Sequence, residues 1–337
     1  MKKPKILIVF CGGTIAMAKN QEGYLAPFLS AKELLAKFPE IKEVADTDCT
    51  ELFNIDSTNM QPHHWTRIAD TIYQNYESYT GFVVTHGTDT MVYSAAALSF
   101  ALQNLSKPVV FTGAQKPTDE IASDARNNLI NACKVAAMDL GEVSIVFGSQ
   151  ILRGNRTKKK SEVMLDAFWS PVTLPIGTIS LEPVFINHHL CRAKKKLKYQ
   201  PGFNPNVIML DVTPGMNPKY LQNILEMGVG GLVLNAPGAG NIPHEENSLV
   251  PFIEKAYQKN IPVVVTTQCL EGSAQMHLYQ AGVLGMRAGA ISAGDMTHEA
   301  ATAKLMWTLW QTKDFRKIKE TMQKNISEEI TVKKHES

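Results

Sequence analysis

Short runs of apolar residues recur along the chain, and their continuity constrains the fold more than any other feature of the sequence. A strand with one solvent-exposed face alternates apolar and polar residues, whereas a strand buried on both faces is apolar throughout. Parallel sheets covered by helices contain strands of the second kind. The clearest of these runs are residues 6–10, 82–85, 109–112, 143–147, 207–212, 231–235 and 263–267.

Stretches with helical periodicity fill several of the gaps between these runs. Residues 90–105, 124–138 and 297–310 each place apolar side chains three or four positions apart, as on one face of a helix. Strands that alternate with helices are typical of the α/β class, in which helices cover a parallel sheet. We therefore predict an α/β fold built on parallel strands.

The length of the chain and a change in composition near its middle predict two domains. The chain has 337 residues, and domains commonly hold about 100–200 residues. Seven prolines lie in residues 171–218, and proline disrupts helices and central strands, so we expect a connection or an edge hairpin there. We expect an N-terminal α/β catalytic domain over residues 1–185, a linker over residues 186–204 and a C-terminal α/β domain over residues 205–337.

Charge and hydropathy argue against several classes of protein. The net charge of +2 is too small to indicate nucleic acid or an anionic membrane as the main partner. No run of about 18 apolar residues exists to span a bilayer. The N-terminal lysines and the apolar residues 6–10 resemble a secretion signal, but this run is short, and Gly12 and Gly13 interrupt it.

The cysteines favour a reducing compartment. They are odd in number, widely spaced and without a C-x-x-C pair, which indicates free thiols rather than a disulfide framework. The five are Cys11, Cys49, Cys133, Cys191 and Cys269. We therefore expect a cytoplasmic protein.

Two loops that follow buried strands combine glycine with threonine. Residues 11–16 read Cys-Gly-Gly-Thr-Ile-Ala, and residues 86–90 read His-Gly-Thr-Asp-Thr. In open α/β sheets, ligands bind at the carboxyl ends of strands, where glycine lets the backbone approach closely and N–H groups at helix starts hold anions. A helix cap explains the first loop equally well, but it explains only one of four polar residues in the second. We favour a functional role for the second loop, with His86 as a structural residue.

Common cofactor and metal motifs are missing from the sequence. Residues 12–17 lack the third glycine of a dinucleotide fingerprint, and no Gly-Lys-Ser/Thr of a phosphate-binding loop follows them. No Gly-x-Ser-x-Gly elbow occurs, and His298 begins a segment without the second histidine of a zinc motif. We expect neither a metal ion nor a bound cofactor.

Three further polar segments have ordinary structural explanations when each is taken alone. Residues 56–60 precede a helical stretch near Pro62 and are explained as a helix cap. The basic residues 153–160 are explained as a solvated loop, as most such runs are. Tyr24 follows the polar residues 20–23, which are suited to a mobile lid.

Taken in order along the chain, these segments resemble the signatures of the bacterial-type L-asparaginase family, specifically its cytoplasmic type I branch. Two ordered signatures in one chain are specific, and the resemblance runs from about residue 5 to residue 315. It implies a flavodoxin-like larger N-terminal domain with a parallel sheet and a smaller α/β C-terminal domain. The matching segments are residues 12–16, 56–58, 85–90, 153–160, 266–269 and 295–300.

The resemblance also implies catalytic roles for individual residues. Thr14 is similar to the family's nucleophilic threonine, and Tyr24 to the tyrosine that assists it from a flexible loop. Thr88, Asp89 and Lys159 resemble a second catalytic group. Lys159 is chosen over its two lysine neighbours by its spacing from the phenylalanine nine positions later.

Substrate contacts follow from the same resemblance. Ser57 matches the residue that holds the substrate's α-carboxylate, and Asp89 matches the residue that pairs with its α-ammonium group. Thr58 and Gly87 adjoin these positions and are expected to bind substrate with them. Asn241 is the candidate for a residue that a neighbouring subunit contributes.

The resemblance implies a homo-oligomer, because the family assembles as tetramers built from tight dimers. The active sites of the family lie between subunits. Some type I members bind asparagine at a second, regulatory site, where Thr267 and Cys269 would lie. The alternative explanation of these two residues is an ordinary strand end.

The implied reaction is the hydrolysis of L-asparagine to L-aspartate and ammonia, with L-glutamine as a second possible substrate. A threonine hydroxyl attacks the side-chain amide once a base takes its proton, and a lysine amine can do so where burial lowers its pKa. An acyl-enzyme ester forms, and water then hydrolyses it. We expect Thr14 to attack, and the sequence leaves Thr88 as an alternative.

Two other functions remain open on the sequence. The amidase subunit that supplies ammonia for charging tRNA with glutamine resembles this family but carries an extra N-terminal domain. A first strand at residue 6 is expected to leave no room for that domain. A non-catalytic amino-acid sensor would use the same pocket without turnover, so ammonia release from asparagine distinguishes it from an enzyme.

Overall fold

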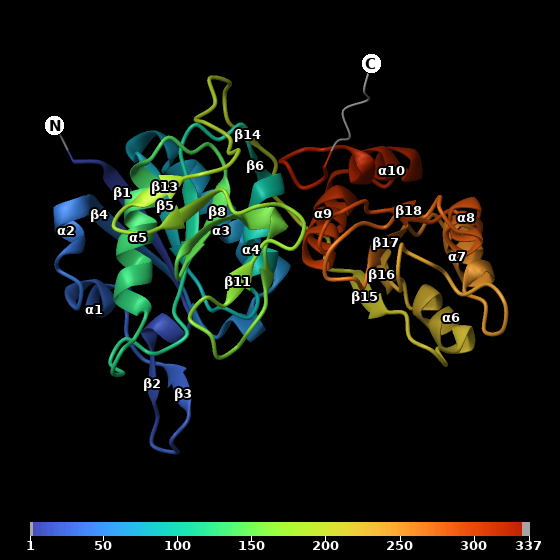
Figure 1. Ribbon diagram of the computed structural model, residues 1–337, viewed down its shortest axis with the longest axis horizontal. Helices are drawn as coiled ribbons and strands as arrows, with labels where there is room; N and C mark the ends of the chain where they lie inside the picture. The colour runs from blue at the N-terminus through green and yellow to red at the C-terminus, as the bar shows by residue number, and fades with distance from the viewer. Residues whose placement is uncertain (1–2, 332–337) are drawn as a thin grey trace. The chain divides into compact units, whose positions relative to one another are not determined.

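The structure, a computed structural model, describes residues 3–331 and divides the chain into two compact units (Figure 1). The first unit ends at Pro201. Each unit has its own sheet with parallel strands and its own helices, which confirms the two-domain α/β prediction. Part of the expected linker, residues 186–204, pairs with the first unit, because β14 (Lys198–Tyr199) lies antiparallel to β6 (Leu102–Gln103).

In the described part of the first unit, the main sheet has eight strands. Strands β4, β1, β5, β7 and β8 lie side by side in this order and run parallel, which is the strand order of flavodoxin-like sheets. Strands β9, β12 and β13 extend the sheet beyond β8 with antiparallel pairing. The strands are β1 (Lys5–Gly12), β4 (Asp46–Ile55), β5 (Gly81–Thr85), β7 (Val109–Thr112), β8 (Val143–Phe147), β9 (Gln150–Arg153), β12 (Gly177–Ile179) and β13 (Pro183–Phe185).

Helices cover both faces of this sheet. Helices α1, α2 and α5 lie on one face, where α5 contacts β1, β5, β7 and β8, and helices α3 and α4 pack together on the other face (Figure 1). These helices connect the parallel strands, as the alternation in the sequence predicts. Their bounds are α1 (Ala31–Ala36), α2 (Ile41–Val44), α3 (Pro62–Gln74), α4 (Met91–Ala101) and α5 (Ala125–Ala137).

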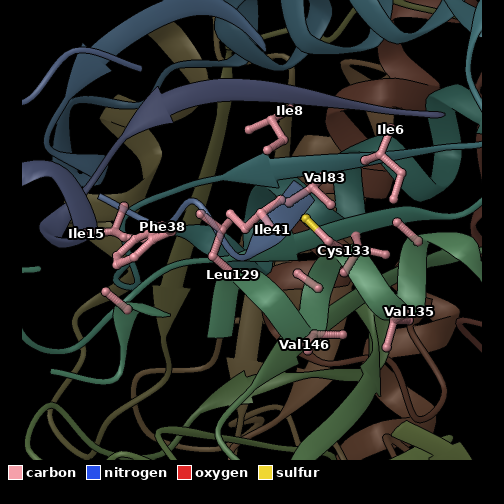
Figure 2. Packing of buried hydrophobic residues seen from close by; sticks show 14 of the residues in the cluster. Ile6, Ile8, Ile15, Phe38, Ile41, Val83, Leu129, Cys133, Val135 and Val146 are labelled. Atoms are coloured by element: carbon pink, nitrogen blue, oxygen red, sulfur yellow. The ribbon is translucent and has the colours of Figure 1, made fainter. Parts of the chain in front are cut away.

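The core under α5 fixes the two central strands of the sheet. Ile6 and Ile8 of β1, Val83 of β5, and Leu129 and Cys133 of α5 belong to one cluster (Figure 2). Each of these side chains is at most 1% exposed. Burial of a large apolar side chain contributes about 1.5–3 kcal/mol, so the strands are held firmly and their carboxyl ends are fixed in space.

The apolar runs do not predict β4, the ten-residue strand at the edge of the sheet. Its residues are exposed or half-buried and none is fully buried, because the strand pairs with β1 on one side only. An edge strand needs no continuous apolar run. Strand β4 matters for the site, because Ile55 at its end accepts a hydrogen bond from Gly13 N at 3.1 Å.

The second unit has a smaller parallel sheet, which the described residues 202–331 build from four strands in sequential order. Helices α6 and α7 supply the apolar cluster on one face, and α9 packs against three of the strands. The strands are β15 (Val207–Asp211), β16 (Gly231–Ala236), β17 (Val263–Thr267) and β18 (Ile291–Ser292). The helices are α6 (Pro218–Glu226), α7 (Val250–Gln258), α8 (Gln280–Arg287), α9 (His298–Gln311) and α10 (Phe315–Gln323).

The segment that follows α10 is held by a buried ion pair. The side chains of Lys304 in α9 and Glu329 are both 0% exposed, and Lys304 Nζ donates to Glu329 Oε1 at 2.5 Å. The same ammonium group donates to Lys324 O at 2.6 Å. Further along, Thr331 N donates to Asp295 Oδ1 at 2.9 Å. Residues 324–331 are therefore fixed against α9.

Three general features complete the description of residues 3–331. All five cysteines are free thiols. No helix in this range is long and apolar enough to cross a bilayer. No group of three or more His, Cys, Asp or Glu side chains in this range is placed to hold a metal ion.

Candidate active site

The candidate site lies where β1 and β5 end. These strands are neighbours, and the chain leaves them in opposite directions, from β1 outward to β4 and from β5 inward to β7. In open α/β sheets, a reversal of this kind leaves a crevice outside the carboxyl ends of the two strands. Residues 13–16 follow β1 and residues 86–90 follow β5, so both predicted loops lie at this crevice.

The two turns touch each other through glycine. A Cβ atom added to Gly13 would lie 2.4 Å from the Gly87 nitrogen, and the φ angle of Gly13 is +90°, so a side chain does not fit there. A Cβ atom added to Gly87 would lie 2.7 Å from Ser57 Oγ. Thr90 Oγ1 also donates to Ser57 O at 2.7 Å. The structure thus packs the turns after β1, β4 and β5 against one another.

Thr14 begins one turn of 3-10 helix directly after Gly13. Its side chain is half-buried, and its hydroxyl makes no hydrogen bond to any other residue that the structure describes. The backbone of the turn is held in place, because Thr118 Oγ1 donates to Ile15 O at 2.5 Å. A hydroxyl without a partner on a fixed turn is available to a bound substrate.

A lysine from a distant part of the sequence reaches the second turn. Lys159 Nζ donates to Thr88 Oγ1 at 2.8 Å and to Asp89 Oδ1 at 2.6 Å. The Lys159 side chain is 16% exposed and the Asp89 side chain 55%, so the ammonium group is shielded while the carboxylate faces solvent. Lys159 ends the short strand β10 (Lys158–Lys159) and stands opposite Phe168. Thr88, Asp89 and Lys159 form one hydrogen-bonded group.

The solvated-loop interpretation of residues 153–160 is wrong for their first half. Arg153, Arg156 and Thr157 are at most 6% exposed. Arg153 Nε donates to Glu142 Oε2 at 2.5 Å, and this carboxylate compensates the buried guanidinium charge. The basic segment is therefore part of the interior, and it carries Lys159 to Thr88.

His86 is a structural residue of the second turn, as expected from its place at a strand end. The ring is fully buried, with Nδ1 donating to Gly87 O at 2.7 Å and Nε2 accepting from Ser94 Oγ at 2.8 Å. Burial lowers the pKa of His86 from 6.5 to about 4, although its hydrogen bond to Gly87 O raises it. The neutral ring braces the turn that carries Thr88.

Titration of His86 should make the first unit less stable in mild acid. Because its pKa in the folded chain lies below the ordinary value of 6.5, the stabilisation is complete above pH 6.5 and is lost as the pH falls through about 4. This pKa difference corresponds to about 3 kcal/mol of unfolding free energy. We expect the loss of stability between about pH 7 and about pH 4.5, measured by urea denaturation, to be smaller in His86→Gln than in the wild type. Equal losses in both proteins would contradict this assignment.

Two family models cover most of the chain. The description "Asparaginase, N-terminal" matches residues 5–192, and "Glutaminase/Asparaginase C-terminal domain" matches residues 206–322. The chain belongs to the asparaginase family.

Named relatives of this asparaginase-family chain fall into two groups. The chain is 36% identical to L-asparaginase 1 of Escherichia coli K12, over 98% of this chain and 99% of that protein. It is 38% identical to a glutamyl-tRNA(Gln) amidotransferase subunit of Methanosarcina mazei, over 97% of this chain and 79% of that protein. The solved structure of L-asparaginase I from Vibrio cholerae matches with a TM-score of 0.90 at 35% identity, covering 98% and 100% of the two chains. The chain is therefore a hydrolase of the asparaginase family with the fold of these structures.

In this asparaginase-family site, Ser57 and Thr58 belong to the turn after β4. Ser57 is buried beside Gly87, whereas Thr58 is exposed. Asp56 Oδ1 accepts from Thr58 N at 2.9 Å and from Thr58 Oγ1 at 2.8 Å. Asp56 thus caps the single 3-10 turn Ser57–Asn59 and not the helix near Pro62, whose N-cap is Gln61. The cap holds Ser57 beside the second turn.

The structure does not bring Tyr24 to the other predicted residues. Tyr24 lies at the tip of the hairpin formed by β2 (Met17–Lys19) and β3 (Leu25–Pro27), which projects from the body of the first unit (Figure 1). Its ring is 59% exposed, and its hydroxyl has no hydrogen bond within residues 3–331. The structure therefore gives Tyr24 no hydrogen bond to the other predicted site residues.

Gln115 is a site residue that the sequence reasoning misses. Its Oε1 atom accepts a hydrogen bond from Thr88 Oγ1 at 3.2 Å. It lies shortly after β7, the strand next to β5, so its place at the carboxyl end of a parallel strand is the signal that points to it. The Thr88 hydroxyl therefore contacts Gln115 and Lys159, and Lys159 in turn contacts Asp89.

In the second unit, the candidates Asn241, Thr267 and Cys269 lie around one loop. Thr267 Oγ1 donates to Gly238 O at 2.5 Å and accepts from Cys269 N at 3.0 Å. A Cβ atom added to Gly238 would lie 3.2 Å from Asn241 Nδ2. The Oδ1 atom of Asn241 is buried and has no hydrogen-bond partner in the described part of the chain. Buried polar atoms are ordinarily paired, so this oxygen is suited to a donor from outside the unit.

Proposed function

We propose that the chain hydrolyses L-asparagine to L-aspartate and ammonia through an acyl-enzyme on threonine. The main support is the contact of Lys159 Nζ with Thr88 Oγ1, beside a turn that presents the unpaired hydroxyl of Thr14. Two hydroxyls and an amine at one crevice are suited to covalent cleavage of an amide. The similarity to L-asparaginase 1 of Escherichia coli supports the same reaction.

The proposed reaction has two steps. In the first step, Thr14 Oγ1 attacks the amide carbon, and the hydroxyl proton passes to the amide nitrogen. Ammonia then leaves, and the aspartate remains bound to Thr14 as an ester. In the second, water attacks this ester and restores the hydroxyl, with proton transfer assisted by Thr88 and Lys159. Proton transfer by a positioned group contributes about 10²–10⁴ in rate. Backbone N–H groups of the two turns would hold the oxyanion.

Ser57 and Asp89 are suited to the two charged ends of the substrate. The Asp89 carboxylate is exposed toward solvent and can accept from the α-ammonium group. The Ser57 hydroxyl, next to Gly87 and Thr58, can donate to the α-carboxylate. Closure of the hairpin that carries Tyr24 would then exclude water from the first step.

We propose that the chain works as a cytoplasmic homo-oligomer, a dimer or a tetramer. The unpaired Asn241 Oδ1 supports a contribution of this residue to a neighbouring subunit's site. Free thiols at all five cysteines are compatible with a reducing compartment. Thr267 and Cys269 are proposed to bind a regulatory asparagine, since Thr267 ends β17 and its hydroxyl is hydrogen-bonded to the backbone of the exposed Cys269.

Ammonia release tests the proposed reaction. The purified chain should release ammonia from L-asparagine, with L-glutamine as the comparison substrate over a wide concentration range. Acid quenching during turnover, followed by peptide mass spectrometry, should locate an aspartyl ester on Thr14. An ester on Thr88 would reverse the order of the two threonines. Binding of asparagine without ammonia release would refute the activity and favour an amino-acid sensor, and sigmoidal rates would indicate regulation.

A second candidate is the amidase role of a tRNA-dependent amidotransferase. The 38% identity to the amidotransferase subunit from Methanosarcina mazei favours it. Ammonia production that depends on added glutamyl-tRNA and its partner subunits would support this candidate. Ammonia production by the chain alone from free asparagine supports the first.

A further inference from the structure

The orientation of the Gln115 side-chain amide is determined by its neighbours. Its Nε2 atom lies 3.3 Å from Ser161 O and 3.2 Å from Met164 O. A carbonyl oxygen only accepts hydrogen bonds, so the NH₂ end of the amide must face these two carbonyls. The oxygen end, Oε1, is then directed at Thr88 Oγ1, 3.2 Å away.

This orientation fixes the direction of the Thr88 hydroxyl proton. Gln115 Oε1 can only accept, so Thr88 must donate to it. Lys159 Nζ lies 2.8 Å from the same Thr88 oxygen and donates to it. The Thr88 oxygen therefore accepts from Lys159 through a lone pair, and the hydroxyl proton points to the amide oxygen of Gln115, which does not take it up. In this arrangement Thr88 is a hydrogen-bond acceptor for Lys159 rather than an activated nucleophile.

The backbone of Gln115 is also held firmly. Gln115 N donates to Asp124 Oδ2 at 2.9 Å, and Lys116 N donates to Asp124 Oδ1 at 3.0 Å. Asn128 Nδ2 donates to the same carboxylate at 2.9 Å and to Gly113 O at 3.0 Å. Asp124 and Asn128 are both buried, so the loop after β7 has little freedom to move Gln115 away from Thr88.

The contacts close a ring that includes the strand carrying the lysine. Lys159 donates to Thr88, Thr88 donates to Gln115, and Gln115 donates to Ser161, which lies two residues beyond Lys159. Ser161 Oγ in turn accepts from Met164 N at 3.1 Å, which keeps both carbonyl acceptors in one turn. The amide of Gln115 thus cross-links the lysine's own segment to the second threonine.

We propose that Gln115 is a positioning residue that sets the hydroxyl orientation of Thr88 and holds Lys159 against it. This inference rests on the proposed amide hydrolysis, in which Thr88 and Lys159 assist and Thr14 attacks. Gln115 acts through Thr88 and contributes nothing to the affinity for substrate. Its removal therefore lowers kcat and leaves KM unchanged.

The first test compares Gln115→Met with Gln103→Met. Gln103 is also half-buried and donates its amide to a backbone carbonyl, Phe100 O, but it follows α4 and lies away from the crevice. We expect kcat for asparagine to fall about 10- to 100-fold in Gln115→Met, because a misplaced catalytic group costs this much. KM should stay within about twofold, and Gln103→Met should retain wild-type kinetics. Unchanged kcat, or a raised KM with unchanged kcat, would overturn the proposal.

Gln115→Glu supplies a readout that a merely structural role would not give. A carboxylate cannot donate to Ser161 O or Met164 O, whereas a protonated carboxyl group donates to one of them and still accepts from Thr88. The ratio of kcat in Gln115→Glu to kcat in the wild type should therefore rise as the pH falls. The same ratio for Gln115→Met should stay constant with pH. A constant ratio for Gln115→Glu would argue against orientation of Thr88 by this side chain.

Labelling of Lys159 separates this proposal from the proposed function. Acetylation of lysines with trace acetic anhydride, measured by peptide mass spectrometry, should be several-fold faster at Lys159 in Gln115→Met than in the wild type or Gln103→Met. Equal labelling would refute the positioning role even where asparagine is hydrolysed. Faster labelling in a chain that releases no ammonia would leave the positioning role intact and refute the activity.

Discussion

Thr14→Ala should lower kcat for asparagine hydrolysis by about four to six orders of magnitude, because it removes the attacking oxygen while leaving the crevice in place. The substitution should leave the fold intact, because the Thr14 hydroxyl has no hydrogen-bond partner among residues 3–331. Initial rates of ammonia release at saturating asparagine measure the effect. Thr14→Ser, which keeps a hydroxyl, is the matched control and should retain measurable turnover.

The alternative order of the two threonines gives a different pattern. If Thr88 were the attacker, Thr14→Ala would still form an acyl-enzyme, and the modified peptide would contain Thr88. The contacts of Thr88 argue against this, because its hydroxyl proton is directed at Gln115 rather than at Lys159. Activity within tenfold of wild type in Thr14→Ala would therefore reject the assignment of the nucleophile.

Lys304→Met is expected to destabilise the second unit by about 3–5 kcal/mol, the usual cost of leaving one member of a buried ion pair without its partner. Glu329 would remain fully buried, with hydrogen bonds from Ile326 N and Ser327 N but without a cation beside its charge. Urea denaturation measures the change in unfolding free energy, and hydrogen exchange in α9 locates it. Lys313→Met, at an exposed position of the same unit, is the control and should change stability by less than about 0.5 kcal/mol.

A double variant separates lost charge from lost packing at this position. In Lys304→Met combined with Glu329→Gln, no charge is buried, and the amide oxygen of the glutamine can still accept from Ile326 N and Ser327 N, which donate to the Glu329 carboxylate. We expect the double variant to recover most of the stability that the single variant loses. A double variant as unstable as the single one would show that packing, and not the ion pair, fixes residues 324–331 against α9.

The sequence predicts the parallel strands well because their signal is local. Each central strand is an uninterrupted apolar run, and the turns after β1 and β5 carry glycine and threonine at fixed offsets from those runs. Chain position relative to a strand end is enough to place Thr14 and Thr88 at the same edge of the sheet. Strand β4 cannot be predicted in this way, because it lies at the edge of the sheet, where exposed positions can hold polar residues.

Side chains whose role depends on a distant partner cannot be predicted from local pattern. Arg153 lies in a basic run that has the composition of a solvated loop. Its burial depends on an ion pair with Glu142, which lies 11 positions earlier in the chain. Lys159 is distinguished from its neighbours only by the family resemblance, since three consecutive lysines carry no internal signal. Gln115 is missed for the same reason, because its partner lies 27 positions away.

The contact between Gly13 and Gly87 has a consequence for how substrate preference can change. The two turns meet through main-chain atoms alone, with no room for a side chain on either glycine. The spacing of the two turns is thus set by contact between their main chains and not by the side chains that line the crevice. Replacement of the exposed Thr58 or of residues in the hairpin of Tyr24 can therefore change which amides fit without displacing the two turns.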